Sequence, residues 1–166
     1  MMAITHLTTS LAVGSLPLMF GYTTDYGNEM LCYLGAVAFG ATVIDIDEPA
    51  SAFGRRLLPI SIVINKAFGH RTITHNLIIA VIGMVVSLMY KNFIMFGFFF
   101  GVSVHILGDA MTGNVRGALA PFSARFYLLP QKMIFRVGSI SEHVILAVSM
   151  LLLFGEHALN IKKVIM

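Results

Sequence analysis

Five apolar segments, each almost free of charged side chains, constrain this chain more than any other feature of its sequence. They cover residues 4–22, 29–44, 74–90, 93–107 and 142–154. A helix needs roughly 17–25 mostly apolar residues to cross a bilayer, and shorter segments require tilting, thinning of the bilayer or burial within a bundle. Only 11% of the 166 residues are charged, whereas an ordinary soluble domain has about 25%. The sequence therefore predicts an all-α, polytopic membrane helix bundle of about five membrane-embedded helices, formed by one integral-membrane domain over residues 1–166.

Two connections between the apolar segments are long and contain apolar stretches of their own. We expect residues 57–68 and 122–137 to be interfacial or re-entrant segments at headgroup depth. Alternating passes place both long connections on one side of the membrane. Of the 11 Lys and Arg residues, all but three lie on that side, and the three exceptions are Lys91, Lys162 and Lys163. The excess of positive charge predicts that this side faces the cytoplasm.

The N-terminal segment is expected to remain in the mature fold. No Lys or Arg precedes its apolar stretch, and His6 and neighbouring threonines interrupt it, which is unlike a cleaved secretory signal. The basic residues of the whole chain form no long run, so a nucleic-acid partner is not expected.

The ionisable side chains beside the apolar segments gather at the ends that share the predicted cytoplasmic side. They are His6, Asp45, Asp47, His70, His75, His105, Asp109 and Glu142. An ionisable group at the edge of a membrane helix is costly unless it is paired or functional. Convergence of such groups from distant parts of the sequence predicts a metal site, and mixed imidazole and carboxylate ligands suit zinc, manganese or iron.

The spacing within this group supports metal binding. His105 and Asp109 are four residues apart and therefore share one face of a helix. His70 and His75 are five apart and would diverge on a single helix. They can converge only if His70 lies in the loop before the helix, with Thr72 or Thr74 near the helix N-terminus.

Simpler interpretations exist for each feature taken alone. A single histidine in an apolar segment is more often a hydrogen-bonded core residue than a ligand. The Asp45–Pro49 stretch could be a solvated helix end, and Arg55–Arg56 could be a topology anchor. Cys32 is interpreted as a small core hydrophobe, and Gly97 and Gly101 are expected to serve helix packing.

Six short motifs follow one another along nearly the whole chain. They are Thr5-His6; Asp45-Ile-Asp47-Glu-Pro49 followed by Ser51 and Gly54-Arg55; Gly69-His70-Arg71 with Thr74-His75; His105 with Asp109 and Thr112; Pro121-Phe122-Ser123 with Arg125-Phe126; and Gly138-Ser139 before Glu142. In this order they resemble the YdjM-like family of membrane-bound, metal-dependent hydrolases, also described as LexA-regulated inner-membrane hydrolases. The sequence departs from the family pattern at Val43-Ile44, Glu48, Asn76 and Val115, and these departures bear on the choice of substrate.

The resemblance implies a multi-pass protein of the bacterial inner membrane that uses a divalent ion, zinc or manganese, with one or two ions per chain. Together with the residue pattern it predicts as metal ligands His6, Asp45, Asp47, His70, His75, His105 and Asp109. The candidates for catalytic roles are Glu142 as ligand or general base, Arg71 and Arg55 as a phosphate clamp, and Thr112 as a residue that orients ligands.

The expected reaction is attack of a metal-activated water on a phosphoester, lipid-linked or amphipathic, at the cytoplasmic membrane face. Membrane lipid is the expected partner. Two alternatives remain open. A metal-ion transporter would need polar groups at several depths, and a non-catalytic membrane regulator or scaffold would bind without turnover.

Overall fold

The computed structural model describes the chain except for residues 20–27, 123–125 and 166, and it describes residues 17–19 and 156–165 by their backbone alone. The described regions contain helices and no strands. The long helices are α1 (Ala3–Met19), α2 (Asn28–Val43), α5 (Leu77–Met89), α6 (Phe93–Thr112) and α7 (Ile140–Ile165). The shorter elements are η1 (Ile44–Asp47), α3 (Ala52–Arg56), α4 (Leu58–Phe68) and η2 (Gln131–Met133).

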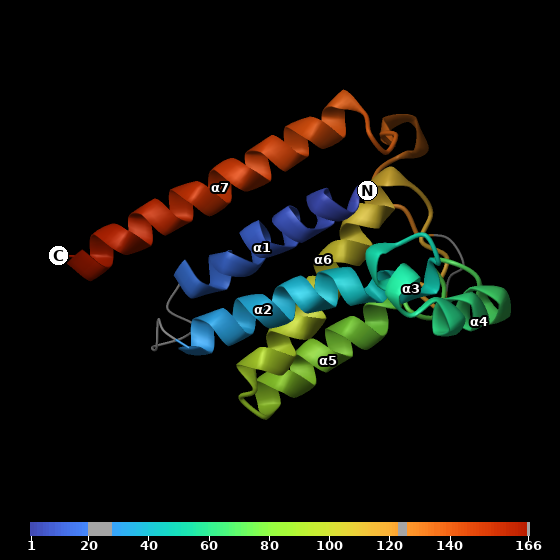
Figure 1. Ribbon diagram of the computed structural model, residues 1–166, viewed down its shortest axis with the longest axis horizontal. Coiled ribbons are helices and arrows are strands. Elements are labelled where there is room, and N and C mark those ends of the chain that lie inside the picture. Colours follow the sequence, from blue (N-terminus) through green and yellow to red (C-terminus); the bar gives the residue numbers. More distant parts are fainter. Residues whose placement is uncertain (20–27, 123–125, 166) are drawn as a thin grey trace.

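The long helices run side by side along one direction, while α3 and α4 form a separate lobe at one end (Figure 1). Helix α6 packs against α2, α5 and α1, and α1 packs in turn against α2 and α7. The buried core lies around α6 and includes Val102, Ile106 and Ala110, together with Ala80 of α5. Each of the five apolar segments thus overlaps one long helix of the bundle, although α6 and α7 extend beyond their segments.

The helix boundaries differ from the sequence prediction where a polar side chain caps a helix. Helix α5 begins at Leu77 because the Asn76 side chain accepts a hydrogen bond from the backbone N–H of Ile79, as N-cap residues do. The cap is therefore neither Thr72 nor Thr74. His70 and His75 both lie in the loop before the helix, which is the condition under which the sequence allows them to converge.

Among the described residues, two helical stretches are long and apolar enough to cross a membrane, namely Asn28–Asp47 and Phe93–Thr112. Leu77–Met89 and Ile140–Gly155 are apolar but shorter. The predicted first span continues to residue 22, and its last residues lie outside the described part of the chain. The interfacial segment predicted over 57–68 contains α4. The one predicted over 122–137 contains only the short turn η2 among its described residues.

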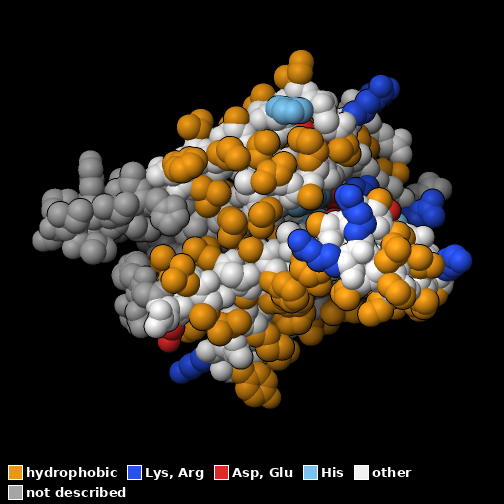
Figure 2. Space-filling view, viewed as in Figure 1, with side chains coloured by type: hydrophobic (Ala, Val, Ile, Leu, Met, Phe, Trp, Pro, Cys, Tyr) orange, Lys and Arg blue, Asp and Glu red, His pale blue; other side chains and the backbone are white. Residues whose placement is uncertain are grey.

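The sequence-based prediction that Cys32 lies in the core is wrong. Its side chain is exposed on α2. The outer surface of many of the helices is apolar, with large side chains such as Leu31, Phe39, Ile82 and Phe154 exposed. Figure 2 shows hydrophobic side chains over most of the visible face and Lys and Arg mainly near the α3–α4 lobe. In such a protein an apolar run does not distinguish the inner face of a helix from its outer face.

Close contact between α2 and α6 depends on glycines, as the sequence predicts for Gly97 and Gly101. A Cβ atom on Gly101 would overlap the backbone oxygen of Val37, and one on Gly97 would meet Tyr33. Gly40 on α2 approaches the backbone of Phe98 in the same way. Small residues allow this approach where lipid-exposed helices pack mainly through van der Waals contact.

Replacing Gly101 with alanine is expected to force α2 and α6 apart and to destabilise the fold by about 1–3 kcal/mol, the usual cost of overpacking. The matched control is Gly35→Ala, since a Cβ atom at Gly35 meets no neighbour and alanine favours the helix by up to about 1 kcal/mol. Thermal unfolding followed by circular dichroism in detergent compares the two variants. Equal melting temperatures would show that the α2–α6 contact tolerates a methyl group.

Candidate metal centre

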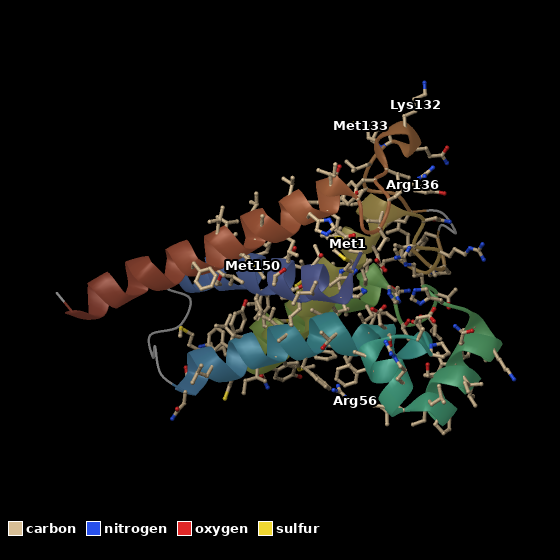
Figure 3. The ribbon with its side chains drawn as sticks, turned by 45° about the horizontal axis from the view of Figure 1, so that its top comes forward. Met1, Arg56, Lys132, Met133, Arg136 and Met150 are labelled. Carbon is tan, nitrogen blue, oxygen red and sulfur yellow. The ribbon has the colours of Figure 1, made fainter. Side chains whose placement is uncertain are left out.

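The ionisable side chains that the sequence predicts to cluster come together near the α3–α4 end of the bundle. Four segments carry them: the start of α1, the turn η1, the loop before α5 and the last two turns of α6. The side chains brought into contact are those of His6, Asp45, Asp47, His70, His75, His105 and Asp109. Figure 3 shows the labelled Met1, Arg56 and Arg136 at this same end, while Met150 lies along α7.

Four of these side chains, Asp45, His75, His105 and Asp109, each offer one donor atom to a common centre, and we call them the quartet. The Nε2 atom of His75 lies 3.6 Å from Asp45 Oδ1 and 3.5 Å from Asp109 Oδ2. The Nε2 atom of His105 lies 3.4 Å and 3.6 Å from the same two oxygens. Asp45 is partly exposed, whereas the other three side chains are buried.

Both histidine rings are held so that Nε2 faces this centre. The Nδ1 atom of His105 donates to the backbone oxygen of Ala41 at 2.6 Å. The Thr74 hydroxyl donates to Asp47 at 2.5 Å and therefore accepts from His75 Nδ1 at 2.9 Å. A neutral imidazole that donates from Nδ1 carries its lone pair on Nε2. Neither Nε2 atom has a hydrogen-bond partner among the described residues, although both are buried.

The spacing and the chemistry of the quartet fit a divalent ion. Ligands in a tetrahedron about 2.1 Å from zinc are separated by about 3.4 Å, and the four nitrogen–oxygen distances in the quartet are 3.4–3.6 Å. Two imidazoles and two carboxylates also suit manganese or iron.

The electrostatics of the quartet favour a positive charge at its centre. Burial by itself lowers the pKa of His75, which lies in the loop outside the helices. The surrounding carboxylates of Asp109, Asp45 and Asp47 favour the protonated ring, outweigh this effect and raise the pKa of His75 to about 10. The positive charge can be supplied by a proton or by a metal ion, so binding of a metal would release protons.

The second oxygen of Asp109 is held from outside the quartet. Asp109 Oδ1 accepts from Arg71 at 2.6 Å and lies 3.1 Å from both His6 Nε2 and the Met1 amino group. The His6 ring also stacks on His105, with 3.8 Å between ring centroids. The structure therefore places His6, predicted as a ligand, where it supports Asp109 and His105 rather than where it faces the quartet centre.

Asp47 is completely buried and organises the loop that carries the two histidines. Its carboxylate accepts from His70 Nδ1 at 2.8 Å and from the backbone N–H of Arg71 at 3.1 Å, in addition to the Thr74 hydroxyl. Its backbone oxygen accepts from Asn65 at 2.7 Å. Carboxylates that hold the ring N–H of metal-binding histidines commonly orient them in this way.

The loop over residues 69–76 is fixed in turn against residues 113–120. The N–H of Gly117 donates to the backbone oxygen of Arg71 at 2.9 Å, and the N–H of Leu77 donates to the backbone oxygen of Ala118 at 2.9 Å. A Cβ atom on Gly117 would overlap the backbone oxygen of Thr72. Arg71 itself has a φ of 58°, a left-handed conformation that is uncommon for residues other than glycine. Two connecting loops thus lock together to present His75 to the helices.

All four residues predicted to be catalytic lie outside the quartet, although Arg71 contacts Asp109. Glu142 is buried, but its two oxygens accept from the backbone N–H groups of Met2 and Gly138 at 2.5 and 2.6 Å. Thr112 donates to the Asp109 backbone oxygen at 3.1 Å. Arg55 is exposed on α3. Ser123 and Arg125, which belong to the fifth motif, lie outside the described residues.

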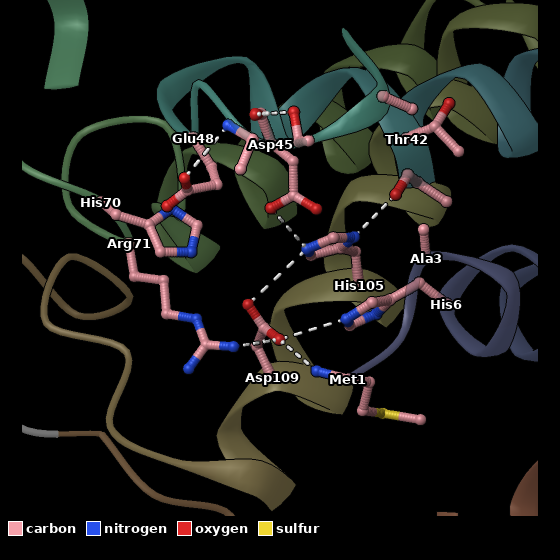
Figure 4. Close-up of a pocket in the computed structure, with 14 residues that line it drawn as sticks. Met1, Ala3, His6, Thr42, Asp45, Glu48, His70, Arg71, His105 and Asp109 are labelled. Carbon is pink, nitrogen blue, oxygen red and sulfur yellow. Dashed lines mark hydrogen bonds and ion pairs between the residues drawn. The ribbon is translucent and has the colours of Figure 1, made fainter. Parts of the chain in front are cut away.

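A cavity of about 260 Å³ opens beside the quartet. Figure 4 shows Asp45 and His105 on one side of it, Asp109 and His6 below, and His70 and Arg71 on the opposite side. Residues 50–52, which lead into α3, also line it. The cavity therefore brings carboxylate, imidazole and guanidinium groups together around one space.

Two contributors to the site were missed from the sequence. The backbone oxygen of Ala41 fixes His105, and a backbone group leaves no signal in side-chain patterns. Asn65 holds the backbone of Asp47. The only trace of it in the sequence is an amide near the end of an apolar stretch.

A family model for the YdjM inner membrane protein matches residues 1–164. The chain belongs to the YdjM inner membrane protein family. It is 34% identical over 125 residues to the uncharacterized protein YvsG of Bacillus subtilis, an alignment that covers 74% of this chain and 76% of that protein. It is 39% identical over 99 residues to the inner membrane protein YdjM of Escherichia coli, covering 53% of this chain and 50% of that protein.

The YdjM protein of Shigella flexneri matches with the same identity and coverage. The aligned region is half the length of these two relatives. No solved structure matches the chain. Membership of the YdjM family thus confirms the resemblance drawn from the motifs and supports a bacterial inner-membrane protein.

Proposed function

We propose that this member of the YdjM family is a metal-dependent hydrolase that acts on a phosphoester at the cytoplasmic face of the inner membrane. The observation that carries the proposal is the pair of buried Nε2 atoms on His75 and His105. They lack hydrogen-bond partners in the described structure and face two carboxylates beside an open cavity. Leaving buried polar atoms unpaired is costly, and a metal ion would satisfy both of them.

A bound divalent ion would lower the pKa of a water molecule and polarise a phosphoryl oxygen. The quartet would hold the ion. Arg71 lies in the cavity lining, and Asp109 fixes its guanidinium through one NH₂ group. The Arg71 side chain is 23% exposed, so its guanidinium can present further donors to an anionic oxygen in the cavity. Planar guanidinium donors match phosphate better than other side chains do.

The membrane placement is part of this proposal. The site lies at the end of the bundle near the α3–α4 lobe, beside exposed basic and apolar side chains that include Arg56, Leu58 and Val63. Basic residues on this side favour a cytoplasmic orientation, and a full set of about five membrane-embedded helices would place the site at headgroup depth. A lipid-linked phosphoester could reach a site at this depth.

The test is to measure bound metal and phosphoester hydrolysis on the same detergent-purified samples. After reconstitution with zinc or manganese, we expect at least about one ion per chain. We also expect hydrolysis of a chromogenic probe such as bis(p-nitrophenyl) phosphate, and loss of both on replacement of His105 with alanine. His143→Ala is the matched control, because His143 is an exposed histidine whose ring donates to the backbone oxygen of Ser139, one turn earlier.

Each result has a distinct meaning. Absence of metal from the parent protein under all loading conditions would overturn the proposal. Stoichiometric metal without turnover of aromatic or lipid phosphoesters would favour a non-catalytic regulator that uses the metal for structure.

A further inference from the structure

The three carboxylates at the site differ in how the protein satisfies them. Asp47 accepts three hydrogen bonds from His70, Arg71 and Thr74. Asp109 accepts from Arg71 and lies next to His6 and the Met1 amino group. No hydrogen bond from any described residue reaches the Asp45 carboxylate. Its polar neighbours among these residues are His75 Nε2 at 3.6 Å and His105 Nε2 at 3.4 Å, both beside Oδ1. Its second oxygen is therefore free to bind something other than protein.

A second group of possible ligands shares Asp45 with the quartet. Asp45, Asp47 and His70 each offer one donor atom, and the three atoms lie within 4.8 Å of one another. His70 Nδ1 and Asp47 Oδ1 are 2.8 Å apart, and an ion bound between these two atoms would replace the proton of their hydrogen bond and release it. Asp47 is fully buried, whereas the His70 side chain is 31% exposed and lines the cavity. This second group thus lies on the cavity side of Asp45, where an ion could enter.

We propose that a second divalent ion binds to Asp45, Asp47 and His70, with Asp45 as the carboxylate shared between the two ions. This inference rests on the proposed function, because the first ion is the one held by the quartet. Two ions that share a ligand form the arrangement that clamps the attacking and leaving oxygens in phosphoester cleavage. The second ion accounts for a carboxylate that the protein leaves without a donor, and it points to a substrate that presents two phosphate oxygens to the cavity.

Charge supports a phosphate ligand for such a centre. At the site and its cavity, Asp45, Asp47, Asp109 and Glu48 supply four negative charges, and Arg71 and the Met1 amino group supply two positive charges. With neutral histidines, one divalent ion balances these groups. A second ion adds two positive charges, which a doubly charged phosphate would offset. The second ion is therefore expected to bind more weakly than the first and more tightly when phosphate is present.

The test uses manganese, which reports both the number of ions and their proximity. The parent protein is equilibrated with Mn²⁺ and inorganic phosphate in detergent, separated from free ions and analysed for metal content and by electron paramagnetic resonance. We expect about two ions per chain with a spectrum of two coupled Mn²⁺ ions, as in sites where the ions are about 3.5–4 Å apart. His70→Ala should retain about one ion and lose the coupling, since the quartet remains intact.

Retention of one ion by His70→Ala also shows that this variant is folded. His143→Ala should behave like the parent. A parent protein that binds a single uncoupled ion even with phosphate would overturn the second site and leave the proposed function standing. Two coupled ions in His70→Ala would equally overturn this ligand assignment. A parent protein that binds no ion would overturn the proposed function itself.

Discussion

Replacing Asp109 with alanine is expected to abolish metal binding and to destabilise the fold even when no metal is present. Asp109 contacts His75 and His105 through one oxygen and Arg71 and His6 through the other. Its removal leaves a guanidinium and several imidazoles buried without their shared anion. Removing one partner of a buried ion pair costs about 3–5 kcal/mol, and the loss of a ligand should weaken metal binding by more than the roughly 10–100-fold seen for outer partners.

The two effects of Asp109→Ala can be separated by measuring unfolding with chelator and with excess zinc. The parent protein should be stabilised by zinc and the variant should not, since a ligand stabilises only the state that binds it. Asp109→Asn keeps the shape and one acceptor oxygen, so in chelator it should lose less stability than the alanine variant. Glu29→Ala removes an exposed carboxylate in the first turn of α2 and should change neither property. Equal stability of Asp109→Ala and the parent in chelator would contradict the network described for this side chain.

Much of the fold could be predicted because a chain with so few charged residues has few alternatives to a bundle of membrane-embedded helices. Each of the five apolar segments overlaps one long helix, and Gly97 and Gly101 lie at the α2–α6 contact as expected. The start of α5 could not be placed correctly, because the choice of Asn76 over Thr74 as cap depends on the loop that Asp47 holds. The exposure of Cys32 could not be predicted either, since the outer face of α2 is as apolar as its inner face.

The site was predictable as a group of residues but not as an arrangement. The four-residue spacing of His105 and Asp109 places both on one helix face, and the structure brings Asp45 and His75 to the same centre. Which residue touches the centre and which supports it depends on tertiary contacts. His6 and His75 both lie at the start of an apolar segment, yet His6 stacks on His105 and contacts the outer oxygen of Asp109, whereas His75 faces the quartet centre.

Glu142 offers the sharpest distinction between a catalytic and a structural role. The sequence predicts a ligand or general base, but both of its oxygens accept from backbone N–H groups, at Met2 and at Gly138. The bond from Met2 ties the start of α7 to the segment that leads into α1, and the bond from Gly138 closes the turn before α7. The side chain is buried and does not line the cavity. Its position indicates a residue that holds two distant parts of the chain together.

Replacing Glu142 with alanine is therefore expected to lower the free energy of unfolding by about 1.5–3 kcal/mol for each backbone donor that it leaves unpaired. Metal content per folded chain should stay close to that of the parent. Chemical denaturation in detergent measures the first quantity, and elemental analysis of the monodisperse fraction measures the second. His143→Ala, an exposed change in the same helix turn, should leave both unchanged. A Glu142→Ala protein that kept its stability but lost its metal would restore Glu142 as a ligand, and it would require the start of α7 to move toward the quartet when metal binds.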